Sequence, residues 1–270
     1  GETFTFDVTD DAHFGELTVD AVTGAYSYRP VPNFTGEDSF TIRVTDSDGL
    51  SSEKTITFEV DNLRNNAPVA DGYDGGAHIS LADTETVVLP GVTTIQADFT
   101  IETWFRADGS QDDGDILFST VGGTHDFGVK FNASGGLDGY VRDVDSAGPA
   151  VNVLDGEWHH VALRYTGSSG DFEIVVDGQA GSTEMKSFTN VGDLTFGDAA
   201  AGMGLVGDID EVRYWNTLRS DEDIALNMHT TVDPGTPGLT TYLRADEGAG
   251  TTVADLTGNG NHATVPSGSL

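Results

Sequence analysis

The fold is decided by ADFTIETWFR (97–106), by DGEWHHVALRYTG (155–167) with FEIVVDGQ (172–179) behind it, and by GLVGDIDEVRYWNTLRSDEDI (204–224). Each segment contains a run of aromatic and β-branched residues, which favour strands. Asp177 and Gly178 have the composition of a tight hairpin turn, and Phe99 and Trp158 are expected to anchor facing sheets. The segments therefore predict antiparallel strands in a β-sandwich.

Further short strand patterns surround these segments at fairly regular spacing, which is typical of sandwiches and barrels. They lie at residues 116–119, 127–131, 137–141 and 194–197. The sequence predicts one helix, which starts at Ser220 as an N-cap followed by acidic residues. Ile224, Leu226 and Met228 would give the helix its apolar contacts, and we expect it to seal one edge of the sandwich.

The three segments, in this order, resemble the LamG-like jelly roll, the concanavalin A-type sandwich shared with laminin G modules and pentraxins. The resemblance covers Ala67 to about Met228. The tail GLTTYLRADEGAGTTVADLTGNGNHATV (238–265) resembles the segment that normally opens such a domain. Either the tail folds back as a strand of the same sandwich or it begins a second copy. We prefer the first alternative, with one domain over 67–270, because the chain ends of sandwiches lie close together.

Residues 1–66 form a separate pattern of short alternating strands that ends in a linker. GELTVDAVTGAYSYRPVPNFTGEDSFTIRVTDSDGLSS (15–52) and NNAPVA (65–70) resemble the cadherin-like repeats of very large bacterial surface proteins. Two opening strands of such repeats are missing, so the domain is expected to be partial. The expected fold class is all-β: a partial cadherin/Ig-like sandwich followed by a LamG-like jelly-roll sandwich with one short helix.

The composition limits the chemistry of the protein. The formal net charge is −33 and cysteine is absent, which argues against nucleic acid as a partner and excludes thiolate catalysis and zinc-thiolate sites. No apolar stretch approaches the roughly 20 residues that a membrane span needs. Many acids lie in Gly- and Asn-rich turns, so Ca²⁺ is the expected cofactor, while solubility alone is the alternative role of the acids.

A calcium cage needs oxygens from two distant segments. The best pairing joins the start of the 208–214 strand to the turn at 255–261, with Asp246 as a further ligand; the alternative is an Asx-rich turn without an ion. The expected ligands are Asp208, Asp210, Glu211, Asp246, Asp255, Asn259 and Asn261.

A second calcium site is implied by the resemblance of DNLRNNAPVA (61–70) to a cadherin linker. On that pattern the ligands are Asp61, Asn65 and Asn66, with Glu37 and Asp38 from a neighbouring loop. Arg64 stands where an acid is expected, and a solvated linker is the alternative.

Ligand binding is expected in polar loops at 108–115, 122–126 and 143–147, clustered at one rim of the sandwich. Among the three tryptophans, Trp215 is the one that we expect to contact a sugar, whereas the others are expected in the core. His159 and His160 point to opposite faces of a strand and so cannot chelate one ion together. The candidate ligand-binding residues are Asp112, Asp113, Asp115, Asp126, Asp143, Asp145 and Trp215.

No catalytic residues are predicted. Glucanases of this fold carry two glutamates and an aspartate in an E-x-D-x-x-E strand, but the nearest match, DIDEVR (208–213), ends in Arg213. Strand alternation would point Arg213 away from Asp208 and Asp210. A nucleophile elbow and nucleotide-binding fingerprints are also absent from the sequence.

The sequence therefore predicts a calcium-dependent, non-catalytic module that binds a ligand, expected to be carbohydrate, in an RTX-type adhesin on the bacterial cell surface. The expected partners are a glycan or another cell-surface ligand and the neighbouring domains of a longer chain. Two alternatives stay open. The chain is a purely structural, calcium-rigidified extender, or it is an ancillary binding domain of a secreted polysaccharide-degrading enzyme.

Overall fold

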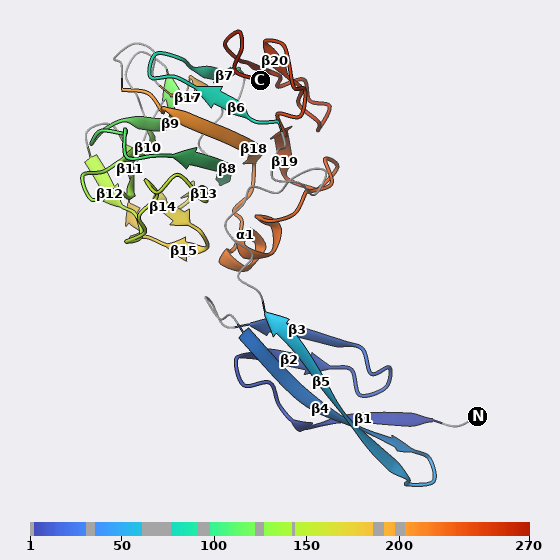
Figure 1. Cartoon of the computed structure of the whole chain (residues 1–270). Coiled ribbons are helices and arrows are strands. Elements are labelled where there is room, and N and C mark those ends of the chain that lie inside the picture. The colour runs from blue at the N-terminus through green and yellow to red at the C-terminus, as the bar shows by residue number, and fades with distance from the viewer. Residues whose placement is uncertain are drawn as a thin grey trace. The chain divides into compact units, whose positions relative to one another are not determined.

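A computed structural model describes residues 3–30, 36–60, 77–90, 98–121, 127–141, 144–185, 192–197 and 203–270. The chain divides into two compact units, Gly1–Arg64 and Asn65–Leu270. Both units consist of strands, and the part of the chain that the structure describes contains one short α-helix (Figure 1). This arrangement confirms the all-β fold class. Among the described residues, no helix is long and apolar enough to cross a membrane.

The first unit contains a three-stranded antiparallel sheet and a β-hairpin. The sheet has the order β1-β4-β5 and the hairpin pairs β2 with β3. Tyr28 of the hairpin packs against Phe58 of the sheet with ring centroids 4.4 Å apart, and Tyr26 packs against Phe40 at 5.0 Å. These aromatic contacts form the small core of the unit. Its strands are β1 (Phe4–Asp10), β2 (Gly15–Val19), β3 (Tyr26–Pro30), β4 (Gly36–Asp46) and β5 (Ser51–Val60).

The second unit is a sandwich of two sheets. One sheet, here called the β8 sheet, has the order β15-β14-β13-β8-β18-β19, with β16 beside β14 and β6 beside β18. Its strands are β6 (Ile79–Leu81), β8 (Phe99–Ala107), β13 (Trp158–Thr166), β14 (Asp171–Val176), β15 (Gln179–Ala180), β16 (Glu184–Met185), β18 (Gly207–Trp215) and β19 (Leu239–Leu243).

The other sheet, here called the β9 sheet, has the order β12-β11-β10-β9-β17-β7-β21-β20. Its strands are β7 (Val87–Leu89), β9 (Ile116–Val121), β10 (Phe127–Phe131), β11 (Leu137–Val141), β12 (Val144–Ala147), β17 (Asp193–Phe196), β20 (Thr252–Val253) and β21 (Ala263–Thr264).

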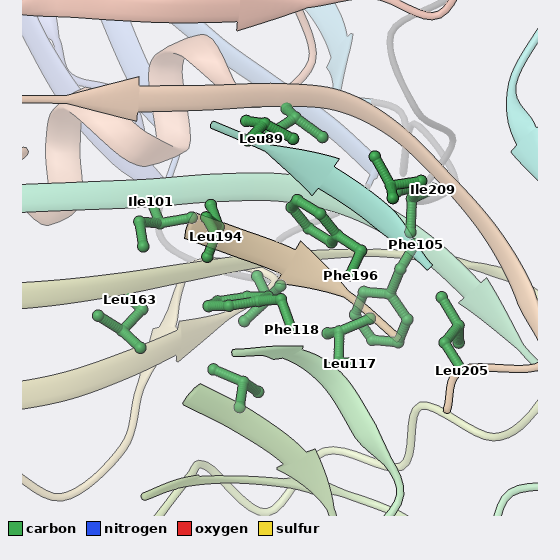
Figure 2. Packing of buried hydrophobic residues seen from close by; sticks show 14 of the residues in the cluster. Leu89, Ile101, Phe105, Leu117, Phe118, Leu163, Leu194, Phe196, Leu205 and Ile209 are labelled. Atoms are coloured by element: carbon green, nitrogen blue, oxygen red, sulfur yellow. The ribbon is translucent and has the colours of Figure 1, made fainter. Parts of the chain in front are cut away.

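The core lies between the two sheets. Ile101, Phe105 and Leu163 of the β8 sheet meet Phe118 and Phe196 of the β9 sheet, and Figure 2 shows these side chains gathered between the strands. All five are fully buried. Burial of a large apolar side chain contributes roughly 1.5–3 kcal/mol, so this cluster holds the sheets face to face.

The sequence analysis expected Phe99 and Trp158 in facing sheets, but they lie in the same sheet. Their strands β8 and β13 are neighbours in one sheet. Phe99 points into the core, whereas Trp158 pairs with Arg106 on the outer face. The prediction was wrong because the pattern of a strand shows that one face is buried but not which sheet the strand joins.

The tail supplies strands to both sheets. β19 pairs with β18, with Leu243 opposite Val212, and β21 pairs with β7 through Thr264 and Val88. Val253 of β20 is fully buried in the core. Residues 239–265 are thus part of the same sandwich in this structure.

The helix α1 (Asp221–Asn227) begins at the predicted cap. The Ser220 hydroxyl accepts a hydrogen bond from the Asp223 N–H, and Asp223 accepts one from the Ser220 N–H in a capping box. Ile224 packs on Ala162 and Val175. The helix therefore covers part of the outer face of the β8 sheet, not an edge of the sandwich, and Leu226 is 63% exposed instead of supplying a contact.

Candidate functional site

The outer face of the β8 sheet carries the polar side chains of its strands. Side chains alternate along β8, so Ile101 and Phe105 face the core while Glu102, Trp104 and Arg106 face outward. The helix packs on Ala162 and Val175, and the chain that follows it covers Trp104 and Arg213. One end of the face stays open to solvent. The covered region and the open end carry different sets of side chains.

A β-bulge in β18 determines which residues of DIDEVR share the outer face. Asp208 pairs with Arg106, Asp210 with Trp104 and Arg213 with Glu102, with a register shift between Asp210 and Arg213. Glu211 takes a left-handed conformation with φ 52° at this bulge. The expectation that Arg213 points away from Asp208 and Asp210 is therefore wrong, because the extra residue resets the alternation.

Arg213 anchors the chain segment 227–230 to the covered part of the face. Its Nη1 donates to the Asn227 carbonyl at 2.8 Å, and its Nη2 donates to the Thr230 carbonyl at 2.7 Å and to Glu211 at 2.8 Å. The indole N–H of Trp104 donates to the Met228 carbonyl at 2.7 Å. These bonds hold segment 227–230 against the sheet, and the side chain of Arg213 is 1% exposed.

Two further buried carboxylates belong to the same network. Glu102 lies 3.3 Å from His160 Nε2, and Glu211 accepts a hydrogen bond from the Tyr242 hydroxyl at 2.5 Å. Burial would raise the pKa of Glu102, but His160 lowers it below its ordinary value. His160 is 1% exposed, so the covered face is a closed ionic network without access for a substrate in this structure.

Asp210 is the buried carboxyl of this network that stays protonated at neutral pH. Its Oδ1 accepts the Glu211 N–H at 2.7 Å. Burial, followed by the negative charge of Glu211, raises the pKa of Asp210 to about 8. Asp246, which is paired with Arg244 at 3.0 Å, adds to the shift.

The open end of the face presents one row of side chains across four strands. Ser80 of β6 lies opposite Asp208 of β18, Asp208 lies opposite Arg106 of β8, and Arg106 lies opposite Trp158 of β13. His78 precedes β6 and reaches the same place. We call Ser80, Asp208, Arg106, Trp158 and His78 the Arg106 row.

Asp208 joins the members of the Arg106 row. Its Oδ2 accepts from Arg106 Nε at 2.8 Å and lies 2.7 Å from Nη2. Its Oδ1 accepts from the Ser80 hydroxyl at 2.6 Å and lies 3.3 Å from His78 Nε2. Burial would raise the pKa of Asp208, but hydrogen bonds from His78, Ser80 and Arg106 hold it well below its usual range.

Trp158 supports the other side of Arg106. The guanidinium carbon lies 5.0 Å from the centre of the Trp158 ring, and His78 meets that ring edge-on at 5.9 Å. Trp158 is only partly buried. The row is thus an ordered, solvent-accessible group of an aromatic ring, an acid, a hydroxyl and two basic side chains on rigid strands.

Trp215 does not take the predicted ligand-binding role in this structure. It is fully buried, and the Arg219 guanidinium lies 4.2 Å from its ring centre. Trp104 is 1% exposed. The tryptophan that is only partly buried is Trp158, which the sequence analysis assigned to the core.

His159 holds the loop beside Trp158. Its Nδ1 lies 2.8 Å from Asp177 and its Nε2 lies 3.0 Å from Asp155. Burial would lower the pKa of His159, but Asp177 and Asp155 raise it above the ordinary value. His159 and His160 do point to opposite faces, and both are buried.

The predicted calcium ligands of the tail are engaged in hydrogen bonds of their own. The Asp255 carboxylate accepts the N–H groups of Tyr242, Thr257 and Asn261. The side-chain amides of Asn259 and Asn261 both donate to the Thr240 carbonyl at 3.0 Å. Asp255 therefore organises the turn at 255–261 through these hydrogen bonds.

The structure does not bring the two predicted halves of the cage together. Asp208 belongs to the Arg106 row, and Glu211 is bound by Arg213, Tyr242 and Arg244. Within the described ranges, no group of three or more acidic or histidine side chains is placed to hold a metal ion. The residues present do not fit a calcium cage at this place, and calcium binding stays a prediction.

The cadherin-like site is described in part. Asp38 is buried, and its oxygens accept the N–H groups of His13 and Phe14 and the Tyr28 hydroxyl at 2.6 Å. Burial would raise the pKa of Asp38, but these bonds lower it to about 2. Glu37 is exposed, and Asp61, Asn65 and Asn66 lie outside the described residues.

The described residues beside the predicted binding loops do not lie at one rim. The Gly114 N–H donates to the Phe131 carbonyl, so the loop at 108–115 lies where β10 ends. Val121 and Phe127, which border 122–126, lie at the opposite end of the antiparallel pair β9 and β10. Successive loops of an antiparallel sheet alternate between its two ends, which the expectation overlooked.

The acids of these loops have separate surroundings. Asp112 and Asp113 are exposed, whereas Asp115 is buried and accepts the Asp112 N–H at 2.6 Å. Asp145 lies in the edge strand β12 and pairs with Lys130 at 2.9 Å. Asp126 and Asp143 lie outside the described residues.

The sequence analysis did not select Arg106, Ser80 or His78. Arg106 follows a run of core residues in FTIETWFR, and its partner Asp208 lies 102 positions away. One signal was present: Arg106 and Asp208 are charged residues at outward positions of two predicted strands. Pairing those strands in the correct register would have placed them together.

Comparisons with known proteins agree with the fold. The profile of the concanavalin A-like lectin/glucanases superfamily matches residues 71–225, and that of bacterial cadherin-like domains matches residues 1–62. No curated protein matches the sequence.

Solved structures with a similar fold were also found. A protein from Bacteroides ovatus, described as a candidate carbohydrate binding protein, is 18% identical with a TM-score of 0.56, over 98% of this chain and 88% of its own. The sialidase module CBM40 of Ruminococcus gnavus is 17% identical with a TM-score of 0.44, over 57% of this chain and 100% of its own. The first likeness shows a shared fold. Because the superfamily profile spans more than half of the sequence, the chain belongs to the concanavalin A-like lectin/glucanases superfamily, with a cadherin-like domain before the sandwich.

Proposed function

We propose that the sandwich is a non-catalytic carbohydrate-binding domain and that the Arg106 row is its binding site. The observation that carries this proposal is the exposed row itself. A partly buried tryptophan, an arginine, a histidine and a serine stand side by side on paired strands, whereas the rest of the outer face is closed. Aromatic rings bind the apolar faces of sugars, and a few placed polar groups bind the hydroxyls.

The row is organised before any ligand arrives. Arg106 is held between Asp208 and the Trp158 ring, and Asp208 is fixed in turn by Ser80 and His78. Fixing side chains in advance lowers the entropy that binding must overcome, which is roughly 0.5–1.5 kcal/mol for each immobilised side chain. The site can therefore bind a ligand through only a few contacts.

The absence of catalysis is part of the same proposal. The DIDEVR strand carries Arg213 where a glucanase has its last acid, and Arg213 is buried under segment 227–230. Glu211 is bound by Arg213, Tyr242 and Arg244. A glycosidase needs two accessible carboxyls on either side of the bond that it cleaves.

The cadherin-like domain suggests the setting. We infer a spacer followed by a binding head in an extracellular, RTX-type adhesin of the bacterial cell surface, acting in attachment or biofilm formation. The support is the order of the two domains, 1–62 and then 71–225, together with the net charge of −33. Calcium dependence of the adhesin is a separate part of this proposal.

A glycan array probed with the whole chain tests the function. The chain should bind a subset of glycans, and Trp158→Ala should reduce that signal at least tenfold because the ring and its hold on Arg106 are both lost. Arg43→Gln is a matched control, since Arg43 forms an exposed sheet-surface pair with Glu53 at 2.7 Å in the first unit. That variant should bind as the unchanged chain does.

The same array, run with Ca²⁺ and with EDTA, separates the alternatives. Binding in either buffer that depends on Trp158 supports the proposal. Silence in both buffers favours a structural extender, and release of reducing sugar from any array glycan would contradict the non-catalytic assignment.

A further inference from the structure

The charge of the Arg106 row, given the function proposed above, specifies the class of sugar. We propose that the row binds acidic sugars through their carboxylate group, as in uronic or sialic acid residues, with Arg106 as the receptor. This inference rests on the placement of the donors and acceptors of the row.

The acceptors of the row are already occupied. Both Asp208 oxygens accept hydrogen bonds within the row, from Ser80, His78 and Arg106, and the Asp208 side chain is 15% exposed. A ligand that offers hydroxyl donors finds no free carboxylate there. Asp208 thus orients the basic groups of the row and does not itself bind the ligand.

The exposed charged groups of the row are basic. The side chains of Arg106 and His78 are 38% and 33% exposed. Arg106 uses Nε and Nη2 for Asp208, and in the part of the chain that the structure describes no partner is found for its Nη1. The Nη1–Nη2 edge of a guanidinium matches the two oxygens of a carboxylate, which accept parallel hydrogen bonds from it.

The position of Arg106 favours this role over that of a mere surface ion pair. The Trp158 ring lies against the guanidinium at 5.0 Å and Asp208 fixes it from the side. Its free edge is therefore held in one direction, toward solvent. A tryptophan beside that edge adds an apolar surface for the sugar ring that bears the carboxylate.

The net charge of −33 opposes an acidic ligand, but chiefly at long range. At physiological ionic strength the screening length is about 8 Å, so distant acids contribute little. A charge-assisted pair at contact distance outweighs them. Binding should accordingly weaken several-fold between low salt and about 0.5 M NaCl, because exposed ion pairs are screened.

Calorimetric titration of the whole chain with matched ligands tests the inference. Trigalacturonic acid and 3′-sialyllactose are each compared with their methyl esters, so that each acid has a neutral counterpart of the same backbone. At least one acid should bind at least tenfold more tightly than its counterpart. Arg106→Gln should reduce that affinity about tenfold or more, Arg106→Lys should reduce it less, and Arg43→Gln should leave it unchanged.

The outcomes separate this inference from the proposed function. Tighter binding of the neutral ligands, or preference for sulfated glycans over carboxylated ones, overturns the acidic-sugar assignment while glycan binding stands. Acid binding that survives both Arg106 variants overturns the role of Arg106. If no glycan of the array binds and neither acid binds, both this inference and the proposed function fail. Thermal melts of each variant show whether a loss of binding reflects a loss of the fold. If Arg106→Gln does not fold, Arg106→Lys is the variant that tests the role of Arg106.

Discussion

Asp210 shows at the scale of one residue how burial sets the pH dependence of stability. Its pKa is raised to about 8 by burial and then by Glu211, so the folded chain keeps a proton that the unfolded chain loses above about pH 4. Between these values the folded state binds more protons, and its stability falls by up to about 1.4 kcal/mol for each pH unit as the pH rises.

The variant Asp210→Asn keeps a neutral acceptor for the Glu211 N–H and removes this penalty. At pH 7 it should unfold at a higher urea concentration than the unchanged chain, and the difference should shrink toward pH 4. Asp113→Asn, at an exposed acid, is the control. Equal effects of Asp210→Asn at both pH values would contradict the raised pKa.

His159 gives a pH dependence of the same sign, because its pKa is also raised in the folded chain. Its pKa is raised by Asp177 and Asp155 despite burial, so its ionic contacts are fully present below the ordinary histidine pKa and are lost as the pH rises through the raised value. His159→Gln should therefore cost more stability at pH 5.5 than at pH 9, measured by urea unfolding. His13→Gln, at an exposed histidine, should show no such trend. A constant cost of His159→Gln across this range would show that its charge does not matter.

The residues also show what a sequence pattern can and cannot predict. Alternation correctly placed His159 and His160 on opposite faces, but it misplaced Arg213 because the bulge at Glu211 leaves no mark in the sequence. The sequence analysis also chose Trp215 over Trp158 as the tryptophan that contacts a sugar. Which tryptophan is exposed depends on what covers the outer face, and the segment 227–230 and Arg219 decide that.

At the scale of elements, segment 227–230 is fixed to the sheet by Arg213. Replacing Arg213 by Met removes a buried cation from beside Glu211 and Glu102 and leaves two backbone carbonyls without their donor. Breaking a buried pair in this way costs roughly 3–5 kcal/mol, whereas an exposed pair contributes about 0–1 kcal/mol.

Urea unfolding of Arg213→Met and of Arg43→Met measures this difference. The first variant should lose several kcal/mol and the second about 1 kcal/mol or less. A loss of less than about 1 kcal/mol in Arg213→Met would mean that the network does not hold the segment.

The elements were the most predictable level of the fold. The long strands with aromatic anchors and the capped helix α1 follow from local pattern. Strands of two or three residues such as β6, β7, β20 and β21 were not predicted, because so short a run has no period to recognise. β6 brings Ser80 to Asp208, so a part of the candidate site was hidden with it.

At the scale of the molecule, the tail completes both sheets of the sandwich. Without residues 239–270, β18 loses its partner β19, β7 loses β21, and the buried Val253, Ala263 and Val265 leave the core. A chain of residues 1–238 should therefore lack the cooperative unfolding transition of the sandwich. Adding the 239–270 peptide should restore it, and a scrambled peptide should not.

That experiment has a clear contrary result. If the 1–238 chain unfolds at the same temperature and with the same near-ultraviolet circular dichroism as the whole chain, the tail is not part of the sandwich. Sequence alone could suggest the fold-back only by resemblance and by the closeness of the chain ends in sandwiches, since strand pairs such as Val212 and Leu243 are set by tertiary packing.

The central claim, that the sandwich binds carbohydrate at the Arg106 row, is tested most directly by the indole N–H signals in a two-dimensional ¹H–¹⁵N spectrum. The chain has three tryptophans, so Trp158→Phe identifies the signal of Trp158. On titration with the glycan that gives the strongest array signal, the Trp158 resonance should shift and saturate, while those of buried Trp104 and Trp215 stay in place. A saturating titration that leaves the Trp158 resonance unmoved would contradict the assignment of the site.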